Sequence, residues 1–470
     1  MDHSGEAFIQ NRTFDEIDVG DSAQLKRVLR NEDIQLFAAI SGDVNPTHID
    51  AEFAHAGQFR EIVGHSLWGG TLISAILGTE FPGPGTVYVS QTLNFWRPVT
   101  VGDTLTVNVT CREKHERNHH IVFDCKVLNQ NGVKVLDGSA EVAAPVERIR
   151  RPRVSPPEIR VSDRDERFRR LLALADGMPP VQIAVAWPCD ADTLRVPLQA
   201  AAAGLAVPML VGPERRIRAL AGEIGLDLKG ARIFDEDDEH IAVATAIALC
   251  RDGGVGALMK GSLHTGHFMS AVVSKASELR TARRISHVFL ASVPAYPKLL
   301  LVTDAAINIA PTLEERAGII QNAIDLSRMT GVPEPKVAVL AAVERIDPRM
   351  PATLEAAELC KMAERGQIVG GALDGPLAFD SAISPGAARA RGLHSRVAGD
   401  ADILAAPGIE TGNMIARQLE HLAGALMGGI VLGARVPIVL SSRADTAQAR
   451  IVSCAIAQLI NHHSRETQSP

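Results

Sequence analysis

The residues with the clearest chemical potential lie between positions 43 and 66. Asp43 precedes His48 by five residues, and the Asn-Pro pair between them predicts a turn. A carboxylate and an imidazole held across a turn can bind one water molecule, remove a proton from it and return a proton to a substrate. An apolar helix is predicted from His65 to about Leu77, and the backbone N–H of Ser66 in its first turn is available to an oxyanion. These groups suit the addition of water to a conjugated double bond.

A simpler interpretation exists for this pair of side chains. Asp43 then caps the turn and His48 is a surface imidazole, and for an isolated Asp and His we favour that interpretation. The surrounding residues favour the catalytic one. They follow the pattern F-A-x-x-S-G-D-x-N-P-x-H-x-D, then V-G-H at the helix start and later NFWRPVTVGDTLTV.

With these motifs, residues 15–145 resemble the MaoC-like (R)-specific enoyl-CoA hydratases of the hotdog fold. The resemblance implies syn hydration of a trans-2-enoyl-CoA by Asp43 and His48, with the thioester oxygen on the amide of Ser66. His65, at the helix start, is predicted to bind substrate. Ser66 stands where the family usually has Gly, so the preferred acyl-chain length stays open.

A second group of possible metal ligands has a plainer explanation. His115, His119 and His120 lie in KHERNHH between two predicted strands. A solvated hairpin tip accounts for them better than a zinc site does, so we expect no metal.

Basic and hydroxyl side chains also gather at the ends of predicted strands in the C-terminal part. The residues concerned are Lys260; Arg284 with Ser286; and Ser442, Arg443 and Asp445. Such positions provide cations and backbone N–H groups for phosphate. No P-loop is present, and no strand runs into a G-x-G-x-x-G turn. Taken singly, each segment is explained as well by solvated charges or a capped helix.

Taken together, residues 167–460 resemble the phosphate acetyl/butyryltransferases, which have a two-lobed α/β fold and exchange an acyl group between coenzyme A and phosphate. Further support comes from LLLVTDAAINIAPTLEERAGIIQNAI, VGGALDGPLAFD and ADILAAPGIETGNMIARQL. The resemblance implies that Ser442 and Arg443 act at the reacting carbonyl and that Lys260 or Arg284 lies near the phosphate.

The sequence departs from this family at two positions. The acetyltransferase branch has an aspartate base several residues after the Ser-Arg pair, whereas the residues around Ala449 include none, and Asp445 is the candidate substitute. Ser270 replaces an arginine. Asp304 and Asn413 are weaker candidates for the cleft, and a helix cap explains either as well as ligand binding does.

The composition limits the class of protein. The 470 residues carry a net charge of −7, which argues against a general nucleic-acid or membrane-surface binder. Six cysteines form no C-x-x-C pair; Cys111 and Cys125 could face each other across a hairpin, but free buried thiols are expected. Because neither a secretory signal nor an apolar run long enough to span a membrane is found, we expect a cytoplasmic protein.

The element pattern changes near residue 147. Residues 1–147 combine one apolar helix with alternating strands, which predicts an α+β hotdog domain whose sheet wraps that helix. An Arg- and Pro-rich linker is predicted over 148–166. Residues 167–470 alternate short apolar strands with Ala-rich helices, which predicts a parallel sheet with ligands at the carboxyl ends of its strands. By resemblance this domain is isocitrate-dehydrogenase-like, with lobes at 167–297 plus 436–470 and at 298–435.

The two resemblances together imply a bifunctional enzyme whose halves both use coenzyme A thioesters, and by resemblance alone it is expected to be a homo-oligomer. Phosphate is the second substrate, and no tightly bound cofactor is expected. Two alternatives for the C-terminal half stay open. In the first, this half is a related metal- and NAD-dependent two-lobed enzyme, although no aspartate cluster for the metal is evident. In the second, it is a degenerate acyl-CoA-binding module, as the replaced arginine at Ser270 suggests.

Overall fold

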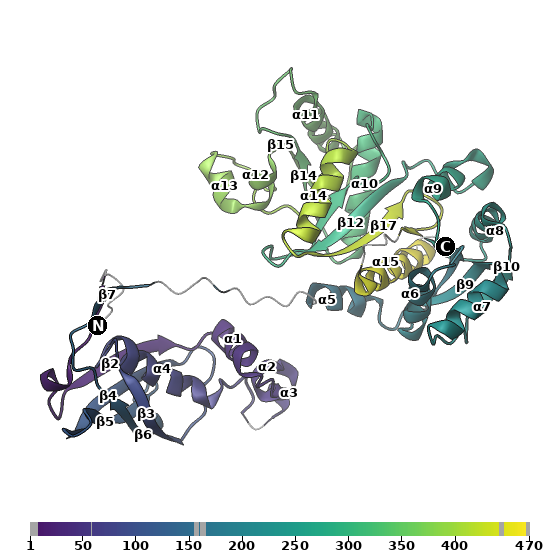
Figure 1. Cartoon of the computed structure of the whole chain (residues 1–470). Coiled ribbons are helices and arrows are strands. Elements are labelled where there is room, and N and C mark those ends of the chain that lie inside the picture. The colour runs from purple at the N-terminus through teal and green to yellow at the C-terminus, as the bar shows by residue number, and fades with distance from the viewer. Residues whose placement is uncertain (1–7, 58, 155–158, 160–165, 441–445, 467–470) are drawn as a thin grey trace. The chain divides into compact units, whose positions relative to one another are not determined.

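A computed structural model describes residues 8–57, 59–154, 159, 166–440 and 446–466 of the chain (Figure 1). The chain divides into two compact units, Met1–Val161 and Ser162–Pro470. The division falls inside the range predicted as the linker. Each unit is described by itself.

The N-terminal unit is an α+β domain with a five-stranded antiparallel sheet. The sheet order is β2-β4-β5-β6-β3, with β2 at Ser22–Val28, β3 at Val87–Phe95, β4 at Thr104–His115, β5 at His120–Leu128 and β6 at Lys134–Ala143. Among the described residues before β3, the α-helices are α1 (Asn31–Ser41), α2 (Pro46–Ile49), α3 (Ala51–Ala56) and α4 (Ser66–Thr79). A short strand β1 (Phe8–Gln10) pairs with β7 (Arg150–Pro152). The prediction missed β2, β1 and β7, which are short or rich in polar residues.

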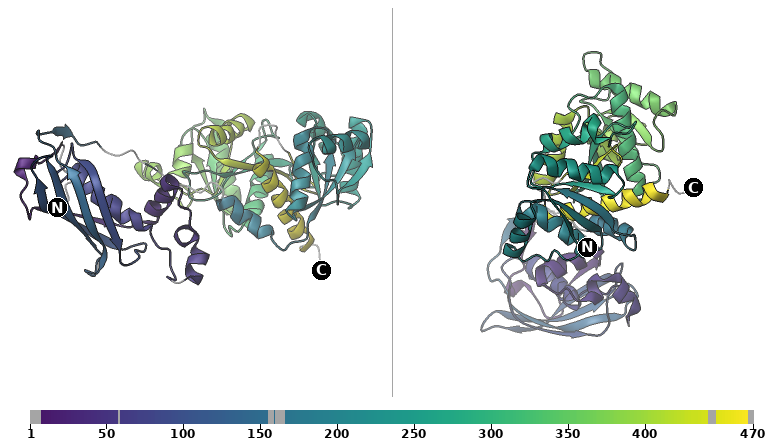
Figure 2. Two further views of the ribbon diagram at one scale, coloured as in Figure 1. Left: turned by 60° about the horizontal axis from the view of Figure 1, so that its bottom comes forward. Right: turned by 90° about the vertical axis from the view of Figure 1, so that its right-hand side faces the viewer.

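Helix α4 lies on the sheet along one face and is not wrapped by it, as Figure 2 also shows. Its buried face carries Trp68, Gly69, Leu72, Ile73, Ile76 and Leu77, and its opposite face, with Leu67, Thr71, Ser74, Ala75 and Gly78, is exposed. The predicted burial of this helix on all sides was wrong: the open face is exposed, and apart from Leu67 its residues are small or polar and would bury little apolar area under a sheet.

The C-terminal unit is built on one eleven-stranded sheet. Its order is β10-β9-β8-β11-β18-β17-β12-β13-β16-β14-β15. The strands are β8 (Val181–Ala186), β9 (Ala206–Gly212), β10 (Arg232–Asp235), β11 (Ala257–Lys260), β12 (Ser286–Ser292), β13 (Leu300–Thr303), β14 (Lys336–Leu340), β15 (Ala372–Leu377), β16 (Ile403–Ala405), β17 (Leu426–Leu432) and β18 (Ile438–Val439). Of these, β10 and β15 were not predicted.

This sheet is parallel only within two blocks, which corrects the prediction of a parallel sheet. The first block consists of the neighbouring strands β10, β9, β8, β11 and β18, which are parallel to one another. The second block consists of β13, β16, β14 and β15, which are also parallel to one another. Between the blocks, β17 and β12 are antiparallel to their neighbours. The segments 293–299 and 433–437, which join β12 to β13 and β17 to β18, are too short for the crossover that parallel neighbours require.

Helices cover both faces of the sheet (Figures 1 and 2). One face packs against α5 (Glu166–Ala175), α6 (Ala191–Ala202), α7 (Glu214–Glu223), α10 (Leu313–Met329), α11 (Pro351–Glu364) and α15 (Ala447–Glu466). The other packs against α8 (Glu239–Arg251), α9 (Thr265–Val273), α12 (Phe379–Ile383) and α14 (Ile409–His421), while the short α13 (Pro385–Ala390) follows α12. The sheet is continuous across both predicted lobes, and β12 pairs with strands of the second, so the lobe boundaries stay a prediction.

The six cysteines are free thiols, as expected, and five of them are buried. Cys111 lies opposite Phe123, and Cys125 lies opposite Val109, so the two cysteines do not face each other across the hairpin. Burial raises the pKa of the Cys454 thiol to about 12. Within the described residues, no helix has the length and apolarity that a membrane crossing requires.

Candidate active sites

The candidate site of the N-terminal unit is assembled where three helices begin or end. Helix α1 ends at Gly42, whose left-handed conformation (φ 74°) turns the chain sharply into Asp43. Helix α2 starts after the cap Asn45 and carries His48. His65 is the N-cap residue of α4. Three short sequence signals thus bring the three side chains together.

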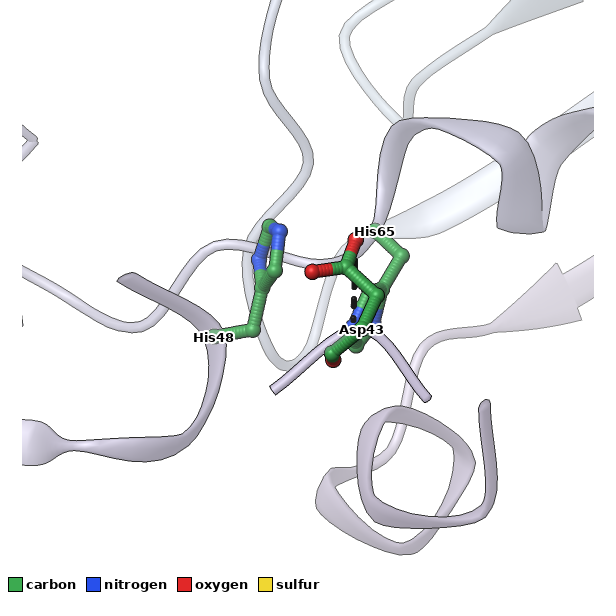
Figure 3. Close-up of side chains that lie close together, drawn as sticks. All are labelled: Asp43, His48 and His65. Carbon is green, nitrogen blue, oxygen red and sulfur yellow. Dashed lines mark hydrogen bonds and ion pairs between the residues drawn. The ribbon is translucent and has the colours of Figure 1, made fainter. Parts of the chain in front are cut away.

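These side chains point toward one another (Figure 3), and each offers a ligand atom within 4.8 Å of the others. His48 Nδ1 lies 2.7 Å from the carbonyl oxygen of Val63. A carbonyl only accepts, so Nδ1 carries the hydrogen, and in the neutral ring Nε2 is free to accept one. The Asp43 side chain is 51% exposed. Water therefore has access to two adjacent proton acceptors.

His65 lies behind this pair. It is 4% exposed, and its Nε2 donates a hydrogen bond of 3.0 Å to the backbone oxygen of Asp43. Its ring is 4.0 Å from that of His48 and 4.8 Å from that of Phe37. Such burial does not favour the substrate contact predicted for His65.

Ser66 is the first residue of α4 and is exposed. In the first turn of a helix the backbone N–H groups have no intrahelical acceptor, and the dipole favours negative charge. Because His65 joins Asp43 to this helix end, the amide of Ser66 and the two proton acceptors belong to one site. The arrangement has the parts that hydration needs.

The same three residues form, within the described ranges, the one group whose ligand atoms converge enough to hold a metal. Metal binding requires unprotonated nitrogens. However, His65 Nε2, which lies 4.0 Å from Asp43 Oδ2, carries the hydrogen donated to the Asp43 carbonyl. The donor set therefore suits proton transfer better than metal binding.

The three histidines at the β4–β5 hairpin have separate neighbours. His120 Nδ1 lies 2.8 Å from Glu141, and His115 lies 3.7 Å from Glu113. His119 packs edge-on against Phe14. The predicted hairpin is confirmed.

In the C-terminal unit, Lys260 lines a cavity of about 640 Å³ at the carboxyl ends of β8 and β11. Lys260 is 8% exposed, and its Nζ donates to the carbonyl oxygens of Gly261 and Leu263. Arg216 and Arg450 add two more cations to the walls. Helix α6 starts there after its cap Asp190, whose carboxylate accepts a hydrogen bond from Ser262. Three cations beside a helix N-terminus suit a phosphate group.

Ser442, Arg443 and Asp445 lie outside the described residues, so their roles stay predictions. Of the described residues on either side, Arg450 of α15 lines the first cavity, and β18 pairs with β11, whose last residue Lys260 lines it too.

Arg284 lines a different cavity, of about 490 Å³, together with Arg280 and Arg283. Arg284 Nε donates to Asn308 at 2.6 Å and its guanidinium pairs with Glu315 at 2.7 Å. Ser270 of α9 also lines this cavity, whose cations come from the segment before β12. The two residues predicted near phosphate, Lys260 and Arg284, line different cavities.

Ser286 and Asp304 have internal contacts. Ser286 is fully buried, and its hydroxyl accepts a hydrogen bond from Asn322 at 2.8 Å. Asp304 is buried and accepts hydrogen bonds from the backbone of the turn that follows it. Neither is positioned as a free ligand group.

Asn413 is exposed and lies inside α14, which begins at Ile409, so a helix cap does not explain it. Its side chain donates to the Ala305 carbonyl at 3.1 Å.

The sequence interpretation missed Arg216, Arg280 and Arg450. Arg216 and Arg450 lie in the first turns of α7 and α15. Asp190 and Arg216 each come four residues after a strand ends, at the start of the helix that follows, and that signal was available.

Fold and sites together define a multidomain protein with a hotdog domain and a phosphotransacetylase-fold domain. Residues 239–458 match the family model "Phosphate acetyl/butaryl transferase", and residues 15–131 match "MaoC like domain". The chain belongs to the phosphate acetyl/butaryl transferase family and carries a MaoC-like domain on the N-terminal side.

Individual proteins are similar to parts of this chain. A phosphate acetyltransferase of Rhizobium meliloti is 52% identical over 302 residues, which are 64% of this chain and 96% of that protein. The crystal structure of a branched-chain phosphotransacylase from Enterococcus faecalis is 27% identical, with 60% of this chain and 99% of that chain covered and a TM-score of 0.53. The unliganded R-hydratase PhaJ1 from Pseudomonas aeruginosa is 42% identical, with 33% and 99% covered and a TM-score of 0.32.

Proposed function

We propose that the chain is a bifunctional acyl-CoA enzyme. Its N-terminal domain hydrates trans-2-enoyl-CoA to (R)-3-hydroxyacyl-CoA, and its C-terminal domain exchanges the coenzyme A of an acyl-CoA for phosphate. Coenzyme A thioesters and phosphate are the substrates, and neither reaction as proposed involves a tightly bound cofactor.

One observation carries the hydratase half: Asp43 and His48 converge beside the N-terminus of α4. A water between them donates a hydrogen bond to the carboxylate and another to His48 Nε2. One acceptor takes a proton, the hydroxyl adds to the β-carbon, and the proton passes to the α-carbon on the same face. The negative charge that develops on the thioester oxygen is stabilised by the Ser66 amide.

Hydration is tested with crotonyl-CoA. The loss of the conjugated thioester absorbance gives the rate, and chiral separation of the hydrolysed product gives its configuration. We expect turnover and (R)-3-hydroxybutyrate. A folded protein that shows no hydration above background, or that forms the (S) product, contradicts the hydratase half.

The transferase half is supported by the 52% identity to a phosphate acetyltransferase over 96% of its length. Here a phosphate oxygen attacks the thioester carbonyl, the carbon–sulfur bond breaks, and the thiolate leaves and takes a proton. Lys260 binds the phosphate, Ser442 and Arg443 act at the carbonyl, and Asp445 serves as the base when the thiol attacks in the reverse direction. The arginines of the second cavity provide charge for the phosphates of coenzyme A.

Phosphate-dependent release of thiol from acetyl-CoA and butyryl-CoA tests this half. Tight coenzyme A binding without turnover would support a degenerate binding module instead. Turnover that requires Mg²⁺ and NAD would support the related dehydrogenase chemistry.

A homo-oligomer belongs to the proposal. Strand β3 is at the edge of its sheet, and Val87, Val89, Phe95 and Trp96 on or next to it are exposed. An apolar edge strand of this kind favours pairing with a second copy. Light scattering of the purified chain measures the mass of the particle.

A further inference from the structure

We infer that His65 is a positioning residue that holds Asp43 in place for hydration, an inference that rests on the proposed function of the same site. The link is the hydrogen bond of 3.0 Å from His65 Nε2 to the backbone oxygen of Asp43. Because a carbonyl only accepts, Nε2 keeps its hydrogen. His65 therefore acts on the reaction through Asp43 and not on the substrate.

Three hydrogen bonds tie residues 43–48 to residues 63–65. The Val63 amide donates to the Thr47 carbonyl at 3.3 Å, and His48 Nδ1 donates to the Val63 carbonyl at 2.7 Å. These two fix His48. Among the hydrogen bonds of the described residues, the third, from His65, is the one that connects Asp43 to the start of α4. Its loss leaves Asp43 held by short-range turn contacts with Ser41 and Asn45.

The surroundings of His65 leave its ring little freedom. The ring is buried and lies between Phe37 and His48, tilted 31° and 35° to their planes. Its second nitrogen, Nδ1, is buried and has no hydrogen-bond partner within the described part of the chain. A ring that donates one nitrogen to a carbonyl and buries the other cannot relay protons to a substrate.

The two histidines therefore differ in tautomer, and we assign them different roles. Each donates one N–H to a backbone carbonyl, but His48 presents its unprotonated Nε2 beside the Asp43 carboxylate, whereas His65 keeps its unprotonated Nδ1 in the interior. Displacing a catalytic group by about 1 Å can cost a hundredfold in rate. The contribution of His65 should appear in kcat.

Two variants separate the hydrogen bond from the ring. His65→Gln places an amide nitrogen close to the position of Nε2, so it can still donate to Asp43, whereas His65→Phe keeps the packing and removes the donor. With crotonyl-CoA and the full chain, we expect His65→Phe to lower kcat about a hundredfold at little changed KM, and His65→Gln to restore most of the rate. Equal loss in both variants, or a raised KM with unchanged kcat, would overturn the inference.

A readout that does not depend on activity accompanies the kinetics. We expect hydrogen exchange of the amides at 43–48 to accelerate in His65→Phe and to stay close to wild type in His65→Gln. If the wild-type chain does not hydrate crotonyl-CoA, the proposed function fails, yet the exchange still decides whether His65 holds this loop. Identical exchange in the two variants contradicts the positioning role.

Discussion

At the scale of single residues, Lys260 is the cation of the first cavity that comes directly from a strand end. It lies at the carboxyl end of β11, is almost fully buried and has Arg216 and Arg450 in the same cavity. Burial strengthens the attraction of a cation for a phosphate oxygen because less water screens it. This position supports the proposal that Lys260 binds phosphate.

We expect Lys260→Met to lower kcat/KM for phosphate by about tenfold to a hundredfold, which is the cost of losing one hydrogen bond to a charged group. Phosphate-dependent thiol release at varied phosphate concentration measures it. Lys275→Met, at an exposed site outside both cavities, is the matched control and should leave the rate unchanged. An unchanged phosphate dependence in Lys260→Met would contradict the assignment.

His287 predicts how stability depends on pH. Burial lowers its pKa to about 4; Arg417 acts in the same direction and Asp304 opposes it. In the unfolded chain the His287 imidazole takes up a proton near pH 6.5, whereas in the folded chain it stays neutral until the pH falls to about 4. The free energy of unfolding of the C-terminal unit should therefore fall as the pH is lowered from 6.5 toward 4.

Urea unfolding followed by Trp187, with Trp68 and Trp96 replaced by Phe, measures this change, because Trp187 is the one tryptophan of residues 162–470. His287→Phe should flatten the pH dependence, and His394→Phe, at an exposed position, should not. Equal slopes in all three proteins would show that His287 is not the group responsible.

At the scale of elements, we propose that the N-terminus of α4 stabilises the negative charge that develops on the thioester oxygen. Ser66 occupies its first position, where proline is well tolerated because no intrahelical hydrogen bond is lost. The preceding residue His65 has an extended backbone (φ −60°, ψ 128°), which proline also accepts. Ser66→Pro therefore removes one N–H with little disturbance of the helix.

We expect Ser66→Pro to reduce kcat for hydration by about a hundredfold to a thousandfold, as loss of one oxyanion donor does elsewhere. Ser66→Ala, which keeps the amide, should remain close to wild type. The two variants are compared with crotonyl-CoA, and their melting curves check the helix. Similar rates in both would remove the Ser66 amide from the mechanism.

Elements also show what could be predicted from the sequence. The alternating strands β3 to β6 and the helix at Ser66–Thr79 were predictable because each has a strong local pattern. The short strand β10 carries no such pattern, and the open face of α4 depends on tertiary packing. The convergence of Asp43 and His48 was predictable from the motif around them, since an isolated Asp and His at this spacing favour a plain turn. The burial of His65 and the separation of Lys260 from Arg284 depend on the folded chain.

At the scale of the whole molecule, the two units have separate hydrophobic cores. One cluster draws on residues 14–144, and the others draw on residues 168–460, so no cluster of the described residues is shared. The candidate sites are likewise made by one unit each. The two reactions should therefore respond independently to substitutions.

The most direct test of the account is a pair of assays on Asp43→Asn in the full chain. The amide keeps the shape of the side chain and removes the carboxylate that, in the proposed mechanism, shares a water with the neighbouring His48. We predict loss of crotonyl-CoA hydration with phosphate-dependent thiol release unchanged from wild type. Hydration that survives the substitution, or loss of both reactions in a folded protein, would contradict the account.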